Sequence, residues 1–136
     1  MSTFQFPSEV SIVKEASRKV LQYIGQETAS EAILFDIKLC FEEALINAIK
    51  YGNKLDKTKT VNVDISKGSN KIEIVVTDQG KGYDFSKVPD PTREENLEKT
   101  NGRGIFLIIQ LMDQVIYERN GSRVRMIKDI SKSQEK

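Results

Sequence analysis

The sequence predicts an α+β fold: a two-layer α/β sandwich in which helices pack on one face of a mixed, mainly antiparallel sheet. Two observations support this prediction. Apolar residues recur every three to four positions in some segments, which is typical of amphipathic helices, and alternate with polar residues in others, which is typical of half-buried strands. Along the 136-residue chain these segments follow the order strand, two helices, hairpin, helix, hairpin.

The chain begins with a predicted strand and an amphipathic helix. Phe4 and Phe6 alternate with polar residues before Pro7, which ends the strand. Ser8 is then placed to cap a helix that runs to about Gly25. Its apolar residues share one face, and its charged residues fall largely on the others.

A long central helix follows. Thr28 and Glu31 form a capping-box pattern, and apolar residues continue at helical spacing until Gly52, which supplies a C-terminal stop.

Two hairpins and a short helix complete the predicted domain. Residues 61–77 alternate apolar and polar side chains around a KGSN turn, which predicts an antiparallel hairpin. Residues 82–103 contain two prolines and little periodicity, so we expect a long loop that is either functional or disordered. A short apolar helix is expected over 104–112. Strands over 114–118 and 123–128, joined by a turn at Asn120 and Gly121, form the second hairpin.

The length is that of one domain, and we assign residues 1–130 to a single unit and 131–136 to a polar tail. The 21 basic residues nearly balance the 20 acidic ones, so we expect no direct binding to nucleic acid or to a membrane. The chain has no histidine and a single cysteine, Cys40, which excludes disulfides, soft zinc sites and histidine-assisted nucleophiles. No secretion signal or bilayer-spanning segment is present, which predicts a cytoplasmic protein.

The first of three candidate functional blocks is EEALINAIKYGN, from Glu42 to Asn53. Glu43 and Asn47 lie one helical turn apart, away from the apolar face. An amide oxygen is a suitable Mg²⁺ ligand, and a carboxylate can accept a proton from an attacking hydroxyl. Taken alone, this segment is better explained as the solvated face of an amphipathic helix, although a mid-helix asparagine weakly opposes that explanation.

The second block, DQGKG, places Asp78 at a strand end before Gly80 and Gly82. Glycines allow the backbone to turn sharply and to approach a planar ligand closely. The Asp78 carboxylate could accept a hydrogen bond from an adenine amino group. An ordinary turn explains this block equally well.

The third block, NGRGIFL, lies at the entry to the short helix. Amides at a helix N-terminus suit phosphate oxygens, and Arg103 adds a possible charge-assisted contact. A glycine-rich helix entry capped by Asn101 is an equal alternative.

Together the three blocks resemble the N, G1 and G2 boxes of the GHKL ATPase superfamily, which has the Bergerat fold. Within it the chain is most similar to the anti-sigma-factor serine/threonine kinases of bacterial partner switching. The resemblance spans nearly the whole chain and includes EEALINAIKYGN, DQGKGYDFSKVPDPTREENL and GRGIFLIIQLMDQV.

The resemblance implies a role for each block. Glu43 would be the general base, Asn47 would bind Mg²⁺, and Asp78 would read adenine in a pocket shaped by Gly80 and Gly82. The segment between the second and third blocks would be an ATP lid. The remaining implied nucleotide contacts are Lys50, Asn101, Gly102, Arg103, Gly104, Ile105 and Ser122.

The sequence departs from the family at two of these places. Ser122 stands where relatives usually carry threonine. Lys50 and Tyr51 stand where close relatives often carry histidine. Neither change removes the implied base or the implied metal ligand.

The resemblance also implies a function. The chain would be an ATP- and Mg²⁺-dependent kinase that phosphorylates an anti-sigma-factor antagonist and sequesters a sigma factor or another regulator. It would form a homodimer, with Lys14 or Arg18 of the first helix as candidate partner contacts. Two alternatives remain: a nucleotide-gated binding module without catalysis, and the catalytic domain of a histidine kinase, which we rank last because the chain has no histidine.

Overall fold

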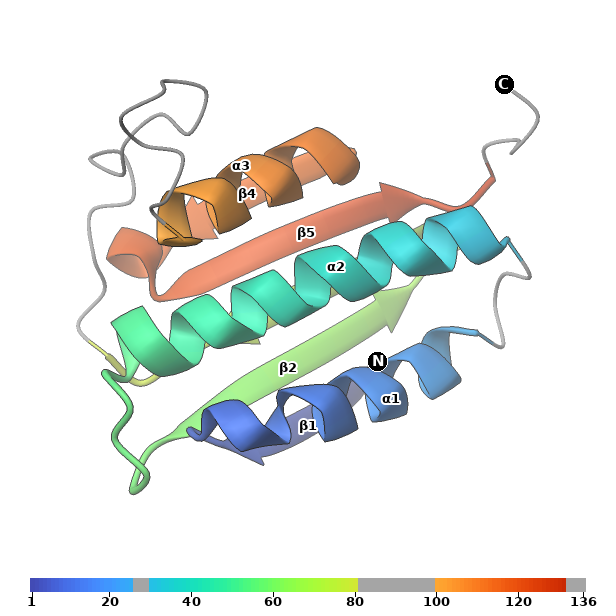
Figure 1. Cartoon of the computed structure of the whole chain (residues 1–136). Coiled ribbons are helices and arrows are strands. Elements are labelled where there is room, and N and C mark those ends of the chain that lie inside the picture. The colour runs from blue at the N-terminus through green and yellow to red at the C-terminus, as the bar shows by residue number, and fades with distance from the viewer. Residues whose placement is uncertain (26–29, 81–99, 132–136) are drawn as a thin grey trace.

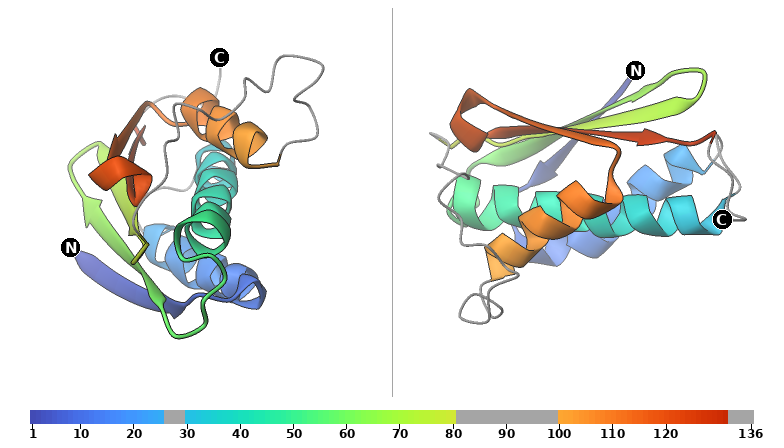
Figure 2. Two further views of the ribbon diagram at one scale, coloured as in Figure 1. Left: turned by 90° about the vertical axis from the view of Figure 1, so that its left-hand side faces the viewer. Right: turned by 90° about the horizontal axis from the view of Figure 1, so that it is seen from above.

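The computed structural model describes residues 1–25, 30–80 and 100–131. In this part of the chain a five-stranded sheet has the strand order β1-β2-β3-β5-β4. The helices α1, α2 and α3 all lie on one face of the sheet, as the view in Figure 1 and the end-on view in Figure 2 show. The α+β class and the two-layer arrangement are therefore confirmed. Every strand pair in the described residues is antiparallel, so this sheet is simpler than the mixed one predicted.

The strands occur in both predicted hairpins and at the N-terminus. Their register aligns Phe4 with Val63, Val63 with Val76, and Val76 with Val124. The three valines are buried under the helices, so this row forms part of the core. The strands are β1 (Ser2–Pro7), β2 (Thr60–Lys67), β3 (Lys71–Thr77), β4 (Gln114–Glu118) and β5 (Arg123–Asp129).

The first helix, α1 (Val13–Ile24), is preceded by the 3₁₀ turn η1 (Val10–Ile12). The predicted cap at Ser8 is wrong. The Ser8 amide donates to the Lys59 carbonyl at 3.2 Å, which extends the β1–β2 pairing by one residue, and the helical turns begin only after Glu9. The Ser8 hydroxyl is buried and has no hydrogen-bond partner in the described residues.

The central helix, α2 (Glu31–Asn47), is capped by Ser30, whose hydroxyl accepts a hydrogen bond from the Ile33 amide at 3.2 Å. Thr28, the first residue of the predicted capping box, lies outside the described residues. After Asn47 the helix changes to a π-helical segment, η2 (Ala48–Gly52). A π-segment inside a helix is uncommon and is often found at functional sites.

The third helix, α3 (Thr100–Leu111), begins four residues earlier than predicted. The third block therefore lies within its first turns rather than in a loop before it. The predicted loop falls mostly on residues 81–99, outside the described part, as does most of the predicted tail, residues 132–136. No helix in the described ranges has both the length and the apolar character needed to cross a bilayer.

A buried lysine ties the two layers together near the C-terminal end of α3. The Lys128 ammonium, on β5, lies 2.6 Å from the Leu111 carbonyl oxygen and 3.2 Å from a carboxylate oxygen of Asp36 on α2. A cation at a helix C-terminus is stabilised by the unpaired carbonyls there. This contact fixes α3 against α2 and the sheet, and so fixes the other end of α3 against the first block.

Candidate functional site

A small cavity lies between α2, α3 and the inner face of the sheet. Its volume is about 10 Å³, room for about one water molecule. It joins Asn47 of the first block to Asp78 of the second, and α3 supplies Ile108. The full lining is Ala44, Asn47, Ala48, Val76, Asp78, Ile108, Tyr117, Gly121, Ser122 and Val124.

At one end of this cavity the first and third blocks meet. Asn47 is buried, and its side-chain oxygen has no hydrogen-bond partner among the described residues. Gly104 of α3 packs directly on this part of α2. A Cβ atom placed on Gly104 would lie 2.5 Å from Glu43 Oε2 and 3.5 Å from Asn47 Nδ2. Glycine at this position therefore lets α3 approach Glu43 without displacing its carboxylate. We call Glu43, Asn47 and Gly104 the phosphate end, after the role that the family resemblance implies for them.

At the other end, Asp78 follows β3 and is 7% exposed. Its amide donates to the Ser122 carbonyl at 2.9 Å, and the Gly80 amide donates to its carboxylate at 2.8 Å. Burial raises the pKa of the Asp78 carboxyl to about 6, although the Gly80 hydrogen bond and the nearby Lys59 charge both act to lower that pKa. The side chain is thus a desolvated acceptor that ionises near neutral pH.

Two glycines allow the first and second blocks to pack against each other. A Cβ on Gly52 would overlap the Asp78 carboxylate, and a Cβ on Gly80 would overlap the Gly52 carbonyl oxygen. The predicted stop at Gly52 is confirmed, because the π-helical segment ends there. The left-handed φ values of this turn occur at Lys54 (53°) and Leu55 (62°), so the reason for glycine at position 52 is its packing: any side chain would displace Asp78. We call Gly52, Asp78, Gly80 and Ser122 the adenine end, after the role that the family resemblance implies for them.

Asn53 received no role in the sequence analysis, yet it connects these two blocks. It is fully buried. Its side-chain oxygen accepts from the Gln79 amide at 2.8 Å, and its side-chain nitrogen donates to the Thr60 carbonyl at 3.0 Å. The only available signal was an asparagine at the end of the first block, because its partner Gln79 lies 26 residues away in the sequence.

The other predicted nucleotide contacts do not all line the cavity. Ser122 lines the cavity, and its hydroxyl donates to the Arg119 carbonyl at 3.0 Å. Ile105 is buried in α3 next to Gly104. Lys50 is exposed on η2 and is not part of the cavity wall. Asn101, Gly102 and Arg103 lie in the first turn of α3, and Gly82 lies outside the described residues.

The metal-binding capacity of the protein side is small. In the described ranges no three Asp, Glu, Cys or His side chains gather closely enough to hold an ion. Cys40 is buried in α2, and burial raises the pKa of its thiol to about 12, so it is an inert core residue. The candidate metal ligand in this cavity is therefore the buried side-chain oxygen of Asn47, which has no hydrogen-bond partner among the described residues.

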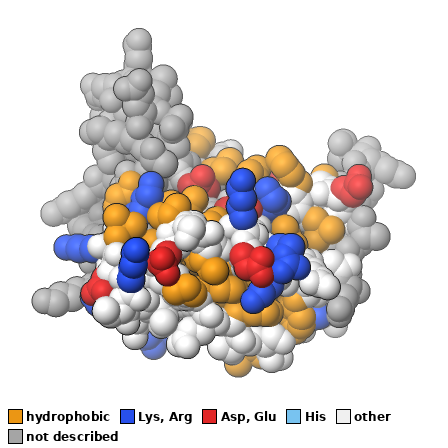
Figure 3. Space-filling model, turned by 60° about the horizontal axis from the view of Figure 1, so that its bottom comes forward, with side chains coloured by type: hydrophobic (Ala, Val, Ile, Leu, Met, Phe, Trp, Pro, Cys, Tyr) orange, Lys and Arg blue, Asp and Glu red, His pale blue; other side chains and the backbone are white. Residues whose placement is uncertain are grey.

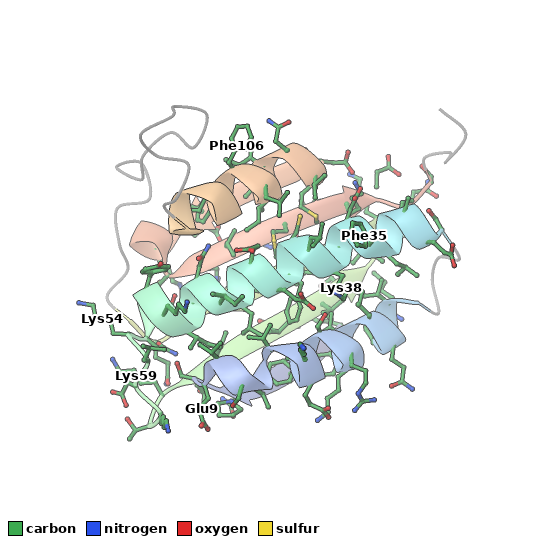
Figure 4. The ribbon with its side chains drawn as sticks, in the orientation of Figure 1. Glu9, Phe35, Lys38, Lys54, Lys59 and Phe106 are labelled. Atoms are coloured by element: carbon green, nitrogen blue, oxygen red, sulfur yellow. The ribbon has the colours of Figure 1, made fainter. Side chains whose placement is uncertain are left out.

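Lys14 and Arg18 are exposed on α1, away from this cavity. A separate groove of about 740 Å³ runs between α1 and α2. Lys38 of α2 lies over this groove in Figure 4, and Figure 3 shows basic, acidic and apolar side chains interspersed on the face that includes α1. The groove is lined by Lys14, Ser17, Arg18, Leu21, Gln22, Lys38 and Glu42.

The fold and the cavity define a nucleotide-binding class of domain: an antiparallel sheet under three helices, with a buried aspartate at a strand end facing a helical asparagine. The chain belongs to the histidine kinase-like ATPase domain family, whose family model matches residues 6–128. Membership of a family of ATPase domains implies that the chain binds ATP.

Curated relatives narrow this class. The chain is 34% identical over 133 residues to a serine-protein kinase RsbW of Staphylococcus epidermidis, covering 92% of this chain and 82% of the relative. It is 26% identical to the Listeria monocytogenes serine-protein kinase RsbW over 97% of this chain and 88% of the relative. The Bacillus subtilis protein of the same name is 28% identical over 68% of this chain and 62% of the relative.

Proposed function

We propose that the chain is an ATP- and Mg²⁺-dependent serine/threonine protein kinase that acts in the cytoplasm as an anti-sigma factor. It phosphorylates an anti-sigma-factor antagonist, and it sequesters a sigma factor while the antagonist is phosphorylated. One observation carries the proposal: the phosphate end and the adenine end meet around a single cavity lined by Asn47 and Asp78. The similarity to relatives named serine-protein kinases supports the choice of substrate.

The adenine end can select the base. The Asp78 carboxylate accepts hydrogen bonds when ionised, which suits the exocyclic amino group of adenine. Guanine presents a carbonyl oxygen at that position and would be repelled. Because Asp78 is buried, binding a base that cannot donate to its carboxylate would leave that carboxylate desolvated and unpaired, at a large cost in free energy. The preference for adenine over guanine should therefore be strong.

The phosphate end fits a magnesium ion. The buried side-chain oxygen of Asn47, which has no hydrogen-bond partner within the described ranges, is a hard neutral ligand. Mg²⁺ commonly takes only one or two protein ligands together with water and substrate phosphates. When bound, the ion would neutralise negative charge on the phosphates. Glu43, one turn before Asn47 on α2, remains beside it as a proton acceptor.

Glu43 would act on the protein substrate. As the target serine or threonine oxygen forms its bond to the γ-phosphorus, the bond from that phosphorus to the ADP oxygen breaks, and the hydroxyl proton passes to the Glu43 carboxylate. Gly104 places the first turns of α3 beside Glu43 and Asn47. Helix geometry leaves the first amides of a helix without partners inside it, so those of α3 would hold phosphate oxygens. Most of the rate acceleration would come from this positioning.

The groove between α1 and α2 is the candidate surface for protein partners. It combines three basic side chains with the apolar Leu21, and Arg18 is paired with Glu15 at 2.8 Å on its exposed rim. We propose that Lys14 and Arg18 contact the antagonist or the sigma factor, and that the chain forms a homodimer. Exchange of Arg18 for glutamate should weaken partner capture without altering ATP affinity.

Phosphoryl transfer to a protein tests the proposal directly. The purified chain, ATP and Mg²⁺ are incubated with the small antagonist protein encoded beside it, and the antagonist is analysed by intact-mass spectrometry. We expect a gain of one phosphoryl group on a serine or threonine. An antagonist of unchanged mass, in a mixture in which the chain binds ATP, would refute the kinase and leave a nucleotide-gated binding module.

A further inference from the structure

The two ends of the cavity are connected by the side chain of one buried residue, Asn53. It lies directly after η2, and its amide donates back to the Ala48 carbonyl at 2.7 Å, so its position is set by the π-helical segment. Its side chain then contacts Gln79, which follows Asp78, and Thr60, which begins β2. Asn53 is therefore fixed to the helix that carries Glu43 and Asn47, and reaches the loop that carries Asp78.

Both halves of the Asn53 amide group are used. The oxygen accepts from the Gln79 backbone amide, one residue after Asp78, and the nitrogen donates to the Thr60 carbonyl at the start of β2. No other residue of this size offers one acceptor and two donors in the same plane. Aspartate could not donate to Thr60, and an apolar side chain would remove the hydrogen bonds to both partly buried partners.

A second hydrogen bond joins two residues of this connection, Thr60 and Gln79. The Thr60 amide donates to the Gln79 side-chain oxygen at 2.6 Å, so Gln79 and Thr60 are linked both directly and through Asn53. The backbone of the same loop lies against η2, because Gly80 packs on the Gly52 carbonyl. Asp78 itself is hydrogen-bonded to Ser122 and Gly80. The loop that carries it is attached to the end of the helix by the packing of Gly80 on Gly52 and by the hydrogen bond from the Gln79 amide to the Asn53 side chain.

We propose that Asn53 is a positioning residue for base recognition: it holds the Asp78 loop at a fixed place on the helix that carries the phosphate end. This inference rests on the proposed ATP site and adds to it the residue that sets the distance between its two ends. If Asn53 is lost, the loop moves relative to α2, and Asp78 no longer meets the adenine amino group while the phosphates are bound.

The consequences for ligand binding are specific. Loss of the Asn53 side-chain hydrogen bonds weakens ATP and ADP binding together, because both nucleotides carry adenine. It has less effect on GTP, which gains nothing from Asp78. A purely structural role for Asn53 predicts a different pattern: lower thermal stability with unchanged nucleotide preference in the folded protein.

The test compares nucleotide affinities by calorimetry in the full chain and in three variants: Asn53→Ala, Gln79→Ala and Asn62→Ala. Asn62 is an exposed asparagine on β2 whose side-chain oxygen accepts a hydrogen bond from Gln5 on β1 at 3.0 Å, so it serves as the matched control. For Asn53→Ala we expect the ATP and ADP dissociation constants to rise about tenfold, the size of one misplaced charge-assisted hydrogen bond, with a smaller change for GTP. Asn62→Ala should match the wild type.

Gln79→Ala provides a variant that keeps the fold even if Asn53→Ala does not, because Gln79 is exposed and only its bond to Thr60 is removed. We expect a rise of about threefold for ATP, in line with one partly exposed hydrogen bond. The inference is overturned if the folded variants bind ATP like the wild type, or if ATP and GTP affinities fall by the same factor. Failure of the wild type itself to bind ATP would instead refute the proposed function.

Discussion

The two ends of the cavity are built in opposite ways. At the adenine end the polar groups are already paired: the Asp78 amide with Ser122, the Asp78 carboxylate with Gly80, and the Gln79 amide with Asn53. At the phosphate end the buried oxygen of Asn47 has no partner in the described part of the chain. Buried polar atoms are almost always hydrogen-bonded, so an unpaired one at a candidate site indicates an atom kept for a ligand.

This difference separates recognition from chemistry. The adenine end is preorganised by the protein, so it can select a base without rearrangement. The phosphate end combines the proposed proton acceptor, the proposed metal ligand and a helix N-terminus, all of which would act on charge that the nucleotide supplies. Changes at the two ends should therefore have different signatures.

The largest expected effect is at the phosphate end. Exchange of Glu43 for glutamine removes the proton acceptor and keeps its shape, so phosphoryl transfer to the antagonist should fall by about 10²–10⁴-fold. ATP affinity, measured by calorimetry, should stay close to that of the wild type. Glu31→Gln, at the opposite end of α2, is the control and should transfer phosphate normally. Unimpaired transfer by Glu43→Gln would exclude Glu43 as the base.

The next effect breaks the adenine end by steric means. In Gly52→Ala the new methyl group overlaps the Asp78 carboxylate and must displace it, so the ATP dissociation constant should rise more than about tenfold. The matched control is Gly68→Ala in the β2–β3 turn, where a Cβ atom meets only the Lys71 carbonyl oxygen at 3.9 Å. Equal ATP affinity in the two folded variants would show that Asp78 does not contact the nucleotide.

The sequence predicted those features of the fold and of the two ends that are caused by neighbouring residues, and it missed those that depend on contacts between distant segments. Alternation and helical periodicity located the hairpins and helices, since burial on one face leaves that pattern in the sequence. The π-helical segment η2 leaves no such pattern. The start of α3 was also missed: two glycines near Asn101 suggested a loop, whereas Gly104 lies inside the helix and packs closely on the Glu43 carboxylate.

The same distinction holds within the site. Glu43, Asn47 and Asp78 were named from local patterns and the family resemblance, and the structure brings them to one region. The reasons for Gly52 and Asn53 could not be predicted, because each depends on a partner more than twenty residues away: Asp78 for the glycine, and Gln79 for the asparagine. Close packing between distant segments is visible only in three dimensions.

A pH effect should be confined to the adenine end. Asp78 must be ionised to accept from adenine, and its pKa in the free protein is raised to about 6. Its ionised fraction falls as the pH drops through that value, so ATP affinity should be about tenfold weaker at pH 5 than at pH 7. Calorimetric titration across this range checks the midpoint. Asp78→Asn should bind weakly at both pH values, and an unchanged pH dependence in that variant would assign the effect to another group.

The smallest expected effect concerns stability. Because the pKa of Asp78 is higher in the folded state than the ordinary value of 3.8, the folded protein binds the proton more tightly than the unfolded chain does. Stability from this group is therefore greatest at low pH and falls as the pH rises from about 4 to about 6. Asp78→Asn, which can still accept from Gly80, should be more stable than the wild type at pH 8 by about 1–3 kcal/mol in urea unfolding. A variant less stable than the wild type at pH 8 would contradict this assignment.

If the two ends of the cavity are built separately, Asn47 serves as the metal ligand of one and Asp78 contacts the base at the other. Calorimetric titration of ATP into the wild type and Asn47→Ala, with Mg²⁺ and with a chelator, separates the two roles. We expect that removing Mg²⁺ weakens ATP binding to the wild type by about tenfold or more, while Asn47→Ala binds weakly with or without Mg²⁺. Adenosine should bind both proteins equally. An Asn47→Ala variant that keeps the full Mg²⁺ dependence of the wild type would show that Asn47 is not the metal ligand.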